Sequence, residues 1–273
     1  MEIRSILVNL DVDHFSPALV KCAGNLAQRF GADLIGLAAA GPSPELIGIE
    51  GAVVAATWYT QEREEIETRL RAMENEFRAL TPPGIKVDWR PYVEAPNRSL
   101  VLNARCADLI VVGSRHGADG SYLRSVDVGD LVLTAGRPVL VVGAGVAEIK
   151  ADKVVVGWKD TREARRAVSD ALPFLERASD VIVVTIHEGD LAAEKASLND
   201  VLGWLRRHGI KARGDVYPYE SGAAVSLEET TKKLEADLIV TGGYGHSRFR
   251  EWLFGGMTRD LLASQTISRF MSN

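Results

Sequence analysis

The sequence predicts an α/β protein built from two tandem, doubly wound domains, each with a parallel sheet. Three observations support this fold class: apolar runs alternate with segments of helical period, the strand-like runs are apolar almost without interruption, and the whole pattern occurs twice. Uninterrupted aliphatic runs such as "ADLIVV" at 107–112 are typical of strands covered on both faces, as in a parallel sheet.

The duplication is visible by direct comparison of two stretches. The one that begins at Ala107, "ADLIVVGSRHGADGSYLRSVDVGDLVL", matches the one that begins at Ala236, "ADLIVTGGYGHSRFREWLFGGMTRDLL", in its strand, its first glycine and its final Asp-Leu pair. The repeat period of about 130–150 residues is far longer than that of a solenoid. We therefore expect domains at 1–147 and 151–273, packed side by side because the join "GAGVAEIKADK" is short.

Strands and helices alternate within each half. The expected strands lie at 5–10, 33–39, 86–93, 107–112 and 138–142 in the first half and at 153–158, 180–186, 211–217 and 236–241 in the second. The final apolar segment, "TISRFMS", makes a poor fifth strand. A helix is expected over 58–80, with a core-facing stripe made by Ile66, Leu70, Met73 and Phe77 and an end at "TPPG".

Composition excludes several classes of protein. A formal net charge of −5 over 273 residues argues against a nucleic-acid partner bound through a basic surface. Cys22 and Cys106 stand in no metal-type spacing, so we expect no zinc site or disulfide framework, and buried thiols instead. No signal peptide pattern and no membrane-spanning apolar window is present, which predicts a cytoplasmic protein. His14, His187 and His208 have no visible carboxylate or cysteine nearby, so no site is assigned to them.

The most informative stretch is "TGGYGHSRFREWLFGGMTRDLL", from Thr241 to Leu262. Three glycines follow a buried strand, and Gly255 and Gly256 open a helix. Glycine lets backbone N–H groups approach an anion, and a helix start supplies unpaired N–H groups and a positive dipole end. In doubly wound sheets ligands bind at this edge, so the stretch predicts an anion site. A turn with a capping glycine pair is the alternative. The P-loop, the dinucleotide fingerprint and the G-x-S-x-G elbow are absent.

The spacing Gly242-x2-Gly245-x9-Gly255 resembles the ATP-binding signature G-x2-G-x9-G-[S/T] of the universal stress protein family. Gly256 stands where that family has its first hydroxyl residue, and Thr258 matches a second hydroxyl two positions on. The resemblance covers the whole chain as two copies. It implies an adenine nucleotide alpha hydrolase-like fold, with five parallel strands per copy in the order 3-2-1-4-5. It also implies that the copies pair through their fifth strands as a pseudo-dimer.

The resemblance further implies an adenine nucleotide, ATP with or without Mg²⁺, in the second copy. The residues it places near the base are Gly157, Trp158, Lys159 and Ile186. Those it places at the ribose and phosphates are Thr241, Gly242, Tyr244, Gly245, Gly255, Gly256, Met257 and Thr258. No catalytic residue and no metal ligand is assigned.

Two departures from the signature affect the second copy. Lys159 replaces an aspartate that the first copy keeps as Asp11. A solvated lysine is the expected outcome, and a lysine that reaches a phosphate is the alternative. Gly256 removes one side-chain contact to phosphate, at a cost of about 1–3 kcal/mol.

The first copy departs further from the signature. His116 and Ser125 replace its second and third glycines, and Asp127 and Asp130 surround the helix start. These carboxylates would repel a phosphate, so no triphosphate is expected there.

Three functions stay open at this stage. The first is a stress-response regulator or sensor that binds ATP in its second copy, and the second is an interaction protein of the same fold without nucleotide. The third is a slow ATPase, for which Glu251 and Lys159 are the only candidates near the loop. A homodimer and an unidentified protein partner also stay open. The apolar connection at 41–58 is expected to cover part of the first copy's crevice or a partner surface, or to pack beneath the long helix.

Overall fold

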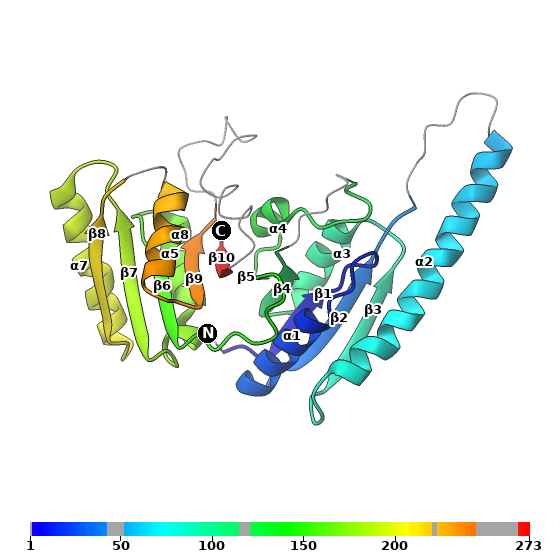
Figure 1. Ribbon diagram of the computed structural model, residues 1–273, viewed down its shortest axis with the longest axis horizontal. Helices are drawn as coiled ribbons and strands as arrows, with labels where there is room; N and C mark the ends of the chain where they lie inside the picture. Colours follow the sequence, from blue (N-terminus) through cyan, green and yellow to red (C-terminus); the bar gives the residue numbers. More distant parts are fainter. Residues whose placement is uncertain (1, 43–51, 115–120, 220–222, 244–266) are drawn as a thin grey trace.

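A computed structural model describes residues 2–42, 52–114, 121–219, 223–243 and 267–273 of the chain. Its strands form one ten-stranded sheet in the order β3-β2-β1-β4-β5-β10-β9-β6-β7-β8. Each half therefore has the strand order 3-2-1-4-5, and the prediction of two tandem doubly wound domains is confirmed. All neighbouring strands are parallel except β5 and β10, which pair antiparallel where the halves meet (Figure 1).

The strands of the first copy are β1 (Ser5–Asn9), β2 (Asp33–Ala39), β3 (Val87–Tyr92), β4 (Leu109–Gly113) and β5 (Val139–Val142). Those of the second are β6 (Lys153–Gly157), β7 (Asp180–Ile186), β8 (Ala212–Tyr217), β9 (Leu238–Gly242) and β10 (Ser268–Ser272). The central strands are buried on both faces, which is why their sequences lack polar alternation. The predicted domain boundary falls between β5 and β6 and stays a prediction.

The helices of the first copy are α1 (Pro17–Phe30), α2 (Ala52–Leu80), α3 (Pro96–Asn103) and α4 (Val128–Thr134), with a 3₁₀ turn at Ala104–Cys106. Those of the second are α5 (Arg162–Asp170), α6 (Leu172–Leu175), α7 (Leu191–Arg207) and α8 (Ala223–Lys233). The predicted core stripe of α2 is confirmed, because all four of its residues are buried. The sequence analysis expected an apolar connection to run from 41 to 58 before the helix. That expectation was wrong for its last part, since α2 already begins at Ala52, and residues 43–51 lie outside the described residues.

The expectation that "TISRFMS" makes a poor fifth strand was also wrong. β10 is buried along its whole length because it pairs with β9 on one edge and with β5 on the other. Arg269 of this strand is fully buried, and burial lowers the pKa of its guanidinium. Its Nη2 atom lies 3.7 Å from the Oε2 atom of Glu228 on α8. The pairing of the fifth strands therefore forms around a buried charged residue.

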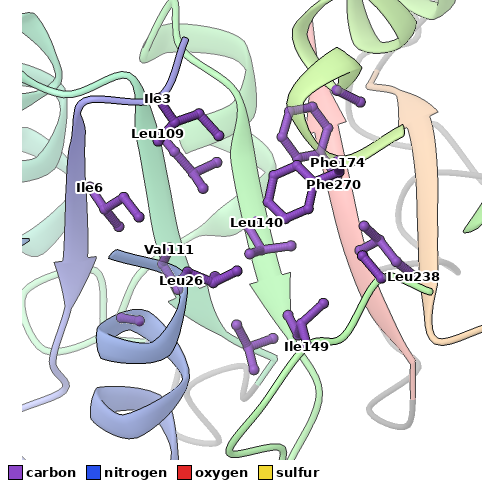
Figure 2. Packing of buried hydrophobic residues seen from close by; sticks show 14 of the residues in the cluster. Ile3, Ile6, Leu26, Leu109, Val111, Leu140, Ile149, Phe174, Leu238 and Phe270 are labelled. Carbon is purple, nitrogen blue, oxygen red and sulfur yellow. The ribbon is translucent and has the colours of Figure 1, made fainter. Parts of the chain in front are cut away.

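One hydrophobic core runs across the junction of the two copies. Phe174 of α6 lies between Phe30 of α1 and Phe270 of β10, with ring centroids 5.0 Å and 5.6 Å away. Both contacts are edge-to-face, the arrangement that aromatic pairs favour. Figure 2 shows Phe174 and Phe270 together with first-copy residues such as Leu26 and Leu140. The two copies are thus halves of one packed unit.

The two cysteines lie in different environments. Cys22 of α1 is fully buried as expected, and burial raises the pKa of its thiol to about 12. Cys106 is only half-buried, so that expectation was wrong for this thiol; its Sγ atom lies 2.9 Å from Nη1 of Arg90. No helix in the described part of the chain has the length and apolar character to cross a membrane.

Candidate functional site

The carboxyl ends of β6 and β9 bring together two of the segments that the sequence assigns to a nucleotide. These strands are parallel neighbours, and Gly157 stands in register with Thr241. Gly242 follows as the last residue of β9. Because parallel strands end at the same edge, residues more than eighty positions apart in the sequence lie side by side there.

Close packing accounts for part of the glycine pattern. A Cβ atom on Gly157 would lie 2.8 Å from Cδ2 of Leu227 on α8. One on Gly242 would lie 2.6 Å from the backbone of Glu163 and Ala164 in the first turn of α5. A side chain at Gly242 would therefore displace the start of α5, and one at Gly157 would require the side chain of Leu227 to move, so both glycines serve packing whatever they bind.

Gly243 connects the start of the glycine-rich loop to the first copy. Its N–H donates to the carbonyl of Ser272 at 2.8 Å, and its carbonyl accepts from Nδ2 of Asn273 at 2.9 Å. A Cβ atom there would lie 2.5 Å from Cγ1 of Val132 on α4. The loop thus begins in contact with a helix of the other copy.

The side chains predicted near the base are occupied by contacts within the protein. Trp158 is 7% exposed, and its Nε1–H donates to Oγ of Ser197 at 3.0 Å. Lys159 is largely exposed and pairs with Glu188, which agrees with the expected solvated lysine. Ile186 is half-buried at the end of β7.

Of the residues predicted to hold the ribose and phosphates, the structure describes only Thr241 and Gly242. Thr241 is buried, and its hydroxyl donates to the carbonyl of Gly242 at 3.2 Å. The remaining candidates lie outside the described residues: Tyr244, Gly245, Gly255, Gly256, Met257 and Thr258, together with Glu251.

A buried carboxylate at this edge escaped the sequence reasoning. Glu163 is 1% exposed at the second position of α5, directly beside Gly242, and pairs with Arg162 at 3.0 Å. The sequence held one signal that could have located Glu163, the helix start at Thr161. The hydroxyl of Thr161 accepts the backbone N–H of Ala164, and an acidic residue in the first turn is stabilised by the positive end of the helix dipole.

A cavity of about 750 Å³ lies at the equivalent edge of the first copy. It spans the ends of β1, β4 and β5, the N-terminus of α1 and the start of the segment that joins the copies. Its lining residues are Asn9, Asp11, Asp13, His14, Phe15, Ser16, Pro17, Leu19, Arg69, Glu76, Val112, Gly113, Ser114, Val126, Val142, Gly143, Ala144, Gly145 and Val146. Sequence reasoning gave this edge only a negative role, because His116 and Ser125 replace signature glycines and Asp127 and Asp130 would repel a phosphate. It did not single out the strand-end residues Asn9 and Ser114.

The segment after residue 120 is tied down beside this cavity. Arg124 donates from Nε to Oδ2 of Asp13 at 2.9 Å, and its Nη1 lies 3.6 Å from Oε1 of Glu62. The hydrogen bond to Asp13 is the main reason that the pKa of Arg124 is raised. The N–H of Gly41 also donates to the carbonyl of Leu123 at 2.7 Å. These contacts hold the segment against the ends of β1 and β2.

The expectation that His187 lacks a carboxylate neighbour was wrong. Its Nδ1 atom lies 2.6 Å from Oε2 of Glu194 on α7. The pKa of Glu194 is lowered, first by the N–H of Glu188 and then by His187 and the N–H of Gly189. Within the described residues, no group of three or more histidine, cysteine or acidic side chains is placed to hold a metal ion.

Known structures supply the comparison, since no family model and no curated protein sequence matches the chain. The chain is similar to a universal stress protein from Archaeoglobus fulgidus DSM 4304, with a TM-score of 0.70 and 16% identity over 100% of this chain and 97% of that one. It is also similar to a putative universal stress protein from Pseudomonas aeruginosa UCBPP-PA14, with a TM-score of 0.62 and 17% identity over 99% and 93%.

A universal stress protein in complex with cAMP aligns at 25% identity over 52% of this chain and 98% of its own, with a TM-score of 0.35. That score is too low to carry an argument about a ligand. The full-length similarities show that the chain has the tandem universal stress protein fold.

Proposed function

We propose that this chain is a tandem universal stress protein that binds ATP in its second copy and acts as a regulator or sensor. The observation that carries the proposal is the spacing Gly242-x2-Gly245-x9-Gly255 directly after β9. In a doubly wound sheet that is the edge at which ligands bind, and the fold of the whole chain agrees with the family whose signature this is.

Each part of the second-copy edge has its own role in the proposal. Gly245, Gly255 and Gly256 leave backbone N–H groups open to the phosphates, and Thr258 adds a hydroxyl; Mg²⁺ accompanies the phosphates. Trp158 forms the floor beneath the base, because its ring is buried and its N–H is already used by Ser197.

The regulatory role is supported by the packing of Gly243. Gly243 at the loop start lies between the C-terminal residues and α4 of the first copy, so a nucleotide bound beside it would act next to the other copy. Coupling of this kind requires a packed contact between the two sites, and the contact of Gly243 with Val132 is one.

Calorimetric titration of the full chain with ATP and Mg²⁺ tests the proposal. We expect one site per chain, and at least about tenfold weaker binding in Gly245→Val, because a side chain there blocks the approach of backbone to phosphate. Gly203→Ala on α7, where an added Cβ atom would meet only Nη1 of Arg207 at 3.8 Å, serves as the control and leaves binding unchanged. Absence of heat, or unchanged affinity in Gly245→Val, refutes the assignment.

An interaction protein without nucleotide is the second candidate. The packing of Gly157 and Gly242 against helices favours it, since these glycines are explained without a ligand. Mass spectrometry of the denatured protein decides between the two, because co-purified adenine nucleotide rules the second candidate out. Slow hydrolysis is a third option, and phosphate release that persists in both Glu251→Ala and Lys159→Ala would remove the only residues proposed for it.

A further inference from the structure

The helix α2 is much longer than its counterpart in the second copy. Both helices connect the second and third strands of their copy, but α2 has 29 residues and α7 has 17. At 1.5 Å per residue the difference is about 18 Å of helix. Figure 1 shows α2 at the outer end of the first copy, with its N-terminal turns extending past the sheet. The second copy forms the same topology without these additional turns, so the fold does not require them.

Two aromatic side chains lie in solvent on this part of α2. Trp58 is 37% exposed and Tyr59 is 49% exposed. All four residues at 58–61 are exposed, and four successive residues point to all sides of a helix. Neighbouring large apolar side chains that remain exposed in this way mark a surface for interaction with another molecule.

We propose that α2 is a dimer interface, packed antiparallel against α2 of a second copy of this chain about a two-fold axis. The face concerned is turned away from the buried stripe of the helix. Its members alternate at three and four residues, the spacing with which two helices pack along their length. All of them are exposed: Trp58, Gln61, Glu65, Thr68, Ala72, Asn75 and Ala79. Three are small residues, which let two helices approach closely.

The charges beside this face select a second copy as the partner. Glu64 and Arg71 flank the face two turns apart, and both are exposed. Nε of Arg71 donates to the carbonyl of Glu67 at 3.2 Å, but within the described residues neither Glu64 nor Arg71 forms an ion pair. Other charges of α2 are paired inside the helix, such as Arg78 with Glu74 at 2.8 Å. In an antiparallel two-fold contact, an acid and a base on one helix meet the base and the acid of the other, so the same pair forms twice.

One register satisfies both the charges and the aromatic side chain. With the two-fold axis between Glu65 and Thr68, Glu64 of each chain lies opposite Arg71 of the other chain. Trp58 then lies against the turn of the other helix at 72–75, where Ala72 leaves room for an indole ring.

Glu65 is the unfavourable member of this arrangement. The two copies of Glu65 approach each other near the axis, and Oε1 of each accepts from Nε2 of its own Gln61 at 2.9 Å. Like charges close to each other weaken the contact. The dimer is therefore expected to be reversible, with the Glu64–Arg71 pairs and the cover over Trp58 outweighing this repulsion.

Sedimentation velocity of the full chain tests the proposal. The unmutated chain is expected to change from monomer to dimer as its concentration rises to about 100 µM. Arg71→Glu and Glu64→Arg are each expected to weaken association about tenfold, because each change turns two opposite-charge contacts into like-charge ones. The double variant, Glu64→Arg with Arg71→Glu, is expected to regain the affinity of the unmutated chain.

The rescue distinguishes a contact between chains from an effect on the helix itself. Residues seven positions apart stand about 10 Å apart along one helix, so the exchanged charges cannot pair within a chain. Trp58→Ala is expected to weaken association as well, because the ring loses its cover. Asp200→Arg, a charge reversal at an exposed position of α7, is the matched control and leaves association unchanged. Urea unfolding of each variant confirms that it is folded.

Three results would overturn the proposal. The first is a monomer at every concentration, and the second is a dimer that responds to neither charge reversal and so forms through another surface. The third is a double variant that associates as weakly as the single ones. The measurements need no nucleotide, so this proposal and ATP binding in the second copy can fail separately.

Discussion

Phe174 is the residue whose removal most directly tests whether the two copies share one core. Its side chain is fully buried between Phe30 of the first copy and Phe270 of β10. Truncation of a buried phenylalanine to alanine costs about 3–5 kcal/mol, which includes two edge-to-face contacts of about 0.5–1.5 kcal/mol each. Because the ring is enclosed from both copies, we expect about 4 kcal/mol for Phe174→Ala and about 1–2 kcal/mol for Phe174→Leu, which keeps most of the volume.

Urea unfolding followed by tryptophan fluorescence and far-ultraviolet circular dichroism measures this loss. The two signals are expected to coincide in one transition that shifts to lower urea, because both copies lose a shared contact. Tyr122→Ala is the control: its side chain is 72% exposed, and the change should stay within about 0.5 kcal/mol. A loss below about 1.5 kcal/mol for Phe174→Ala, or two transitions of which only one shifts, would show that the core is not shared.

Three further predictions concern packing, pH and thiol reactivity. Gly36→Ala should destabilise the fold by about 1–3 kcal/mol, because the added Cβ atom would lie 2.6 Å from the ring of Phe77 on α2. Gly203→Ala on α7 should instead stabilise it by about 0.5–1 kcal/mol. Changes of the same sign in the two free energies of unfolding, measured in urea, would contradict this. Since the folded pKa of Glu194 is lowered, its contribution is present above the ordinary value of 4.5 and lost as the pH falls below it. Glu194→Gln should then be less stable than the unmutated chain at pH 7 and equal to it in strong acid, and a pH-independent difference would argue against the assignment. Burial raises the pKa of Cys22 to about 12, so a disulfide reagent at pH 8 should modify only Cys106 in the native chain and both thiols in denaturant; two fast thiols in the native chain would be the contrary result.

The sequence alone determined the features that depend on local periodicity and on repetition. The α2 stripe from Ile66 to Phe77 was predicted correctly because a period of 3.6 residues is written in adjacent turns. The aliphatic runs predicted central parallel strands, and the internal repeat predicted two copies. Of the candidate site, Gly157, Thr241 and Gly242 were predicted to meet, because all three lie at the carboxyl ends of strands of one parallel sheet.

The tertiary structure decided what depends on contacts between distant segments. β10 carries a buried arginine and two buried serines, so its composition concealed a strand that pairing on both edges creates. Likewise Asn9 and Ser114 line one cavity although they lie more than a hundred positions apart. A polar side chain is read from sequence as exposed, and only the neighbours that folding brings to it determine whether it is buried, paired or turned toward a ligand.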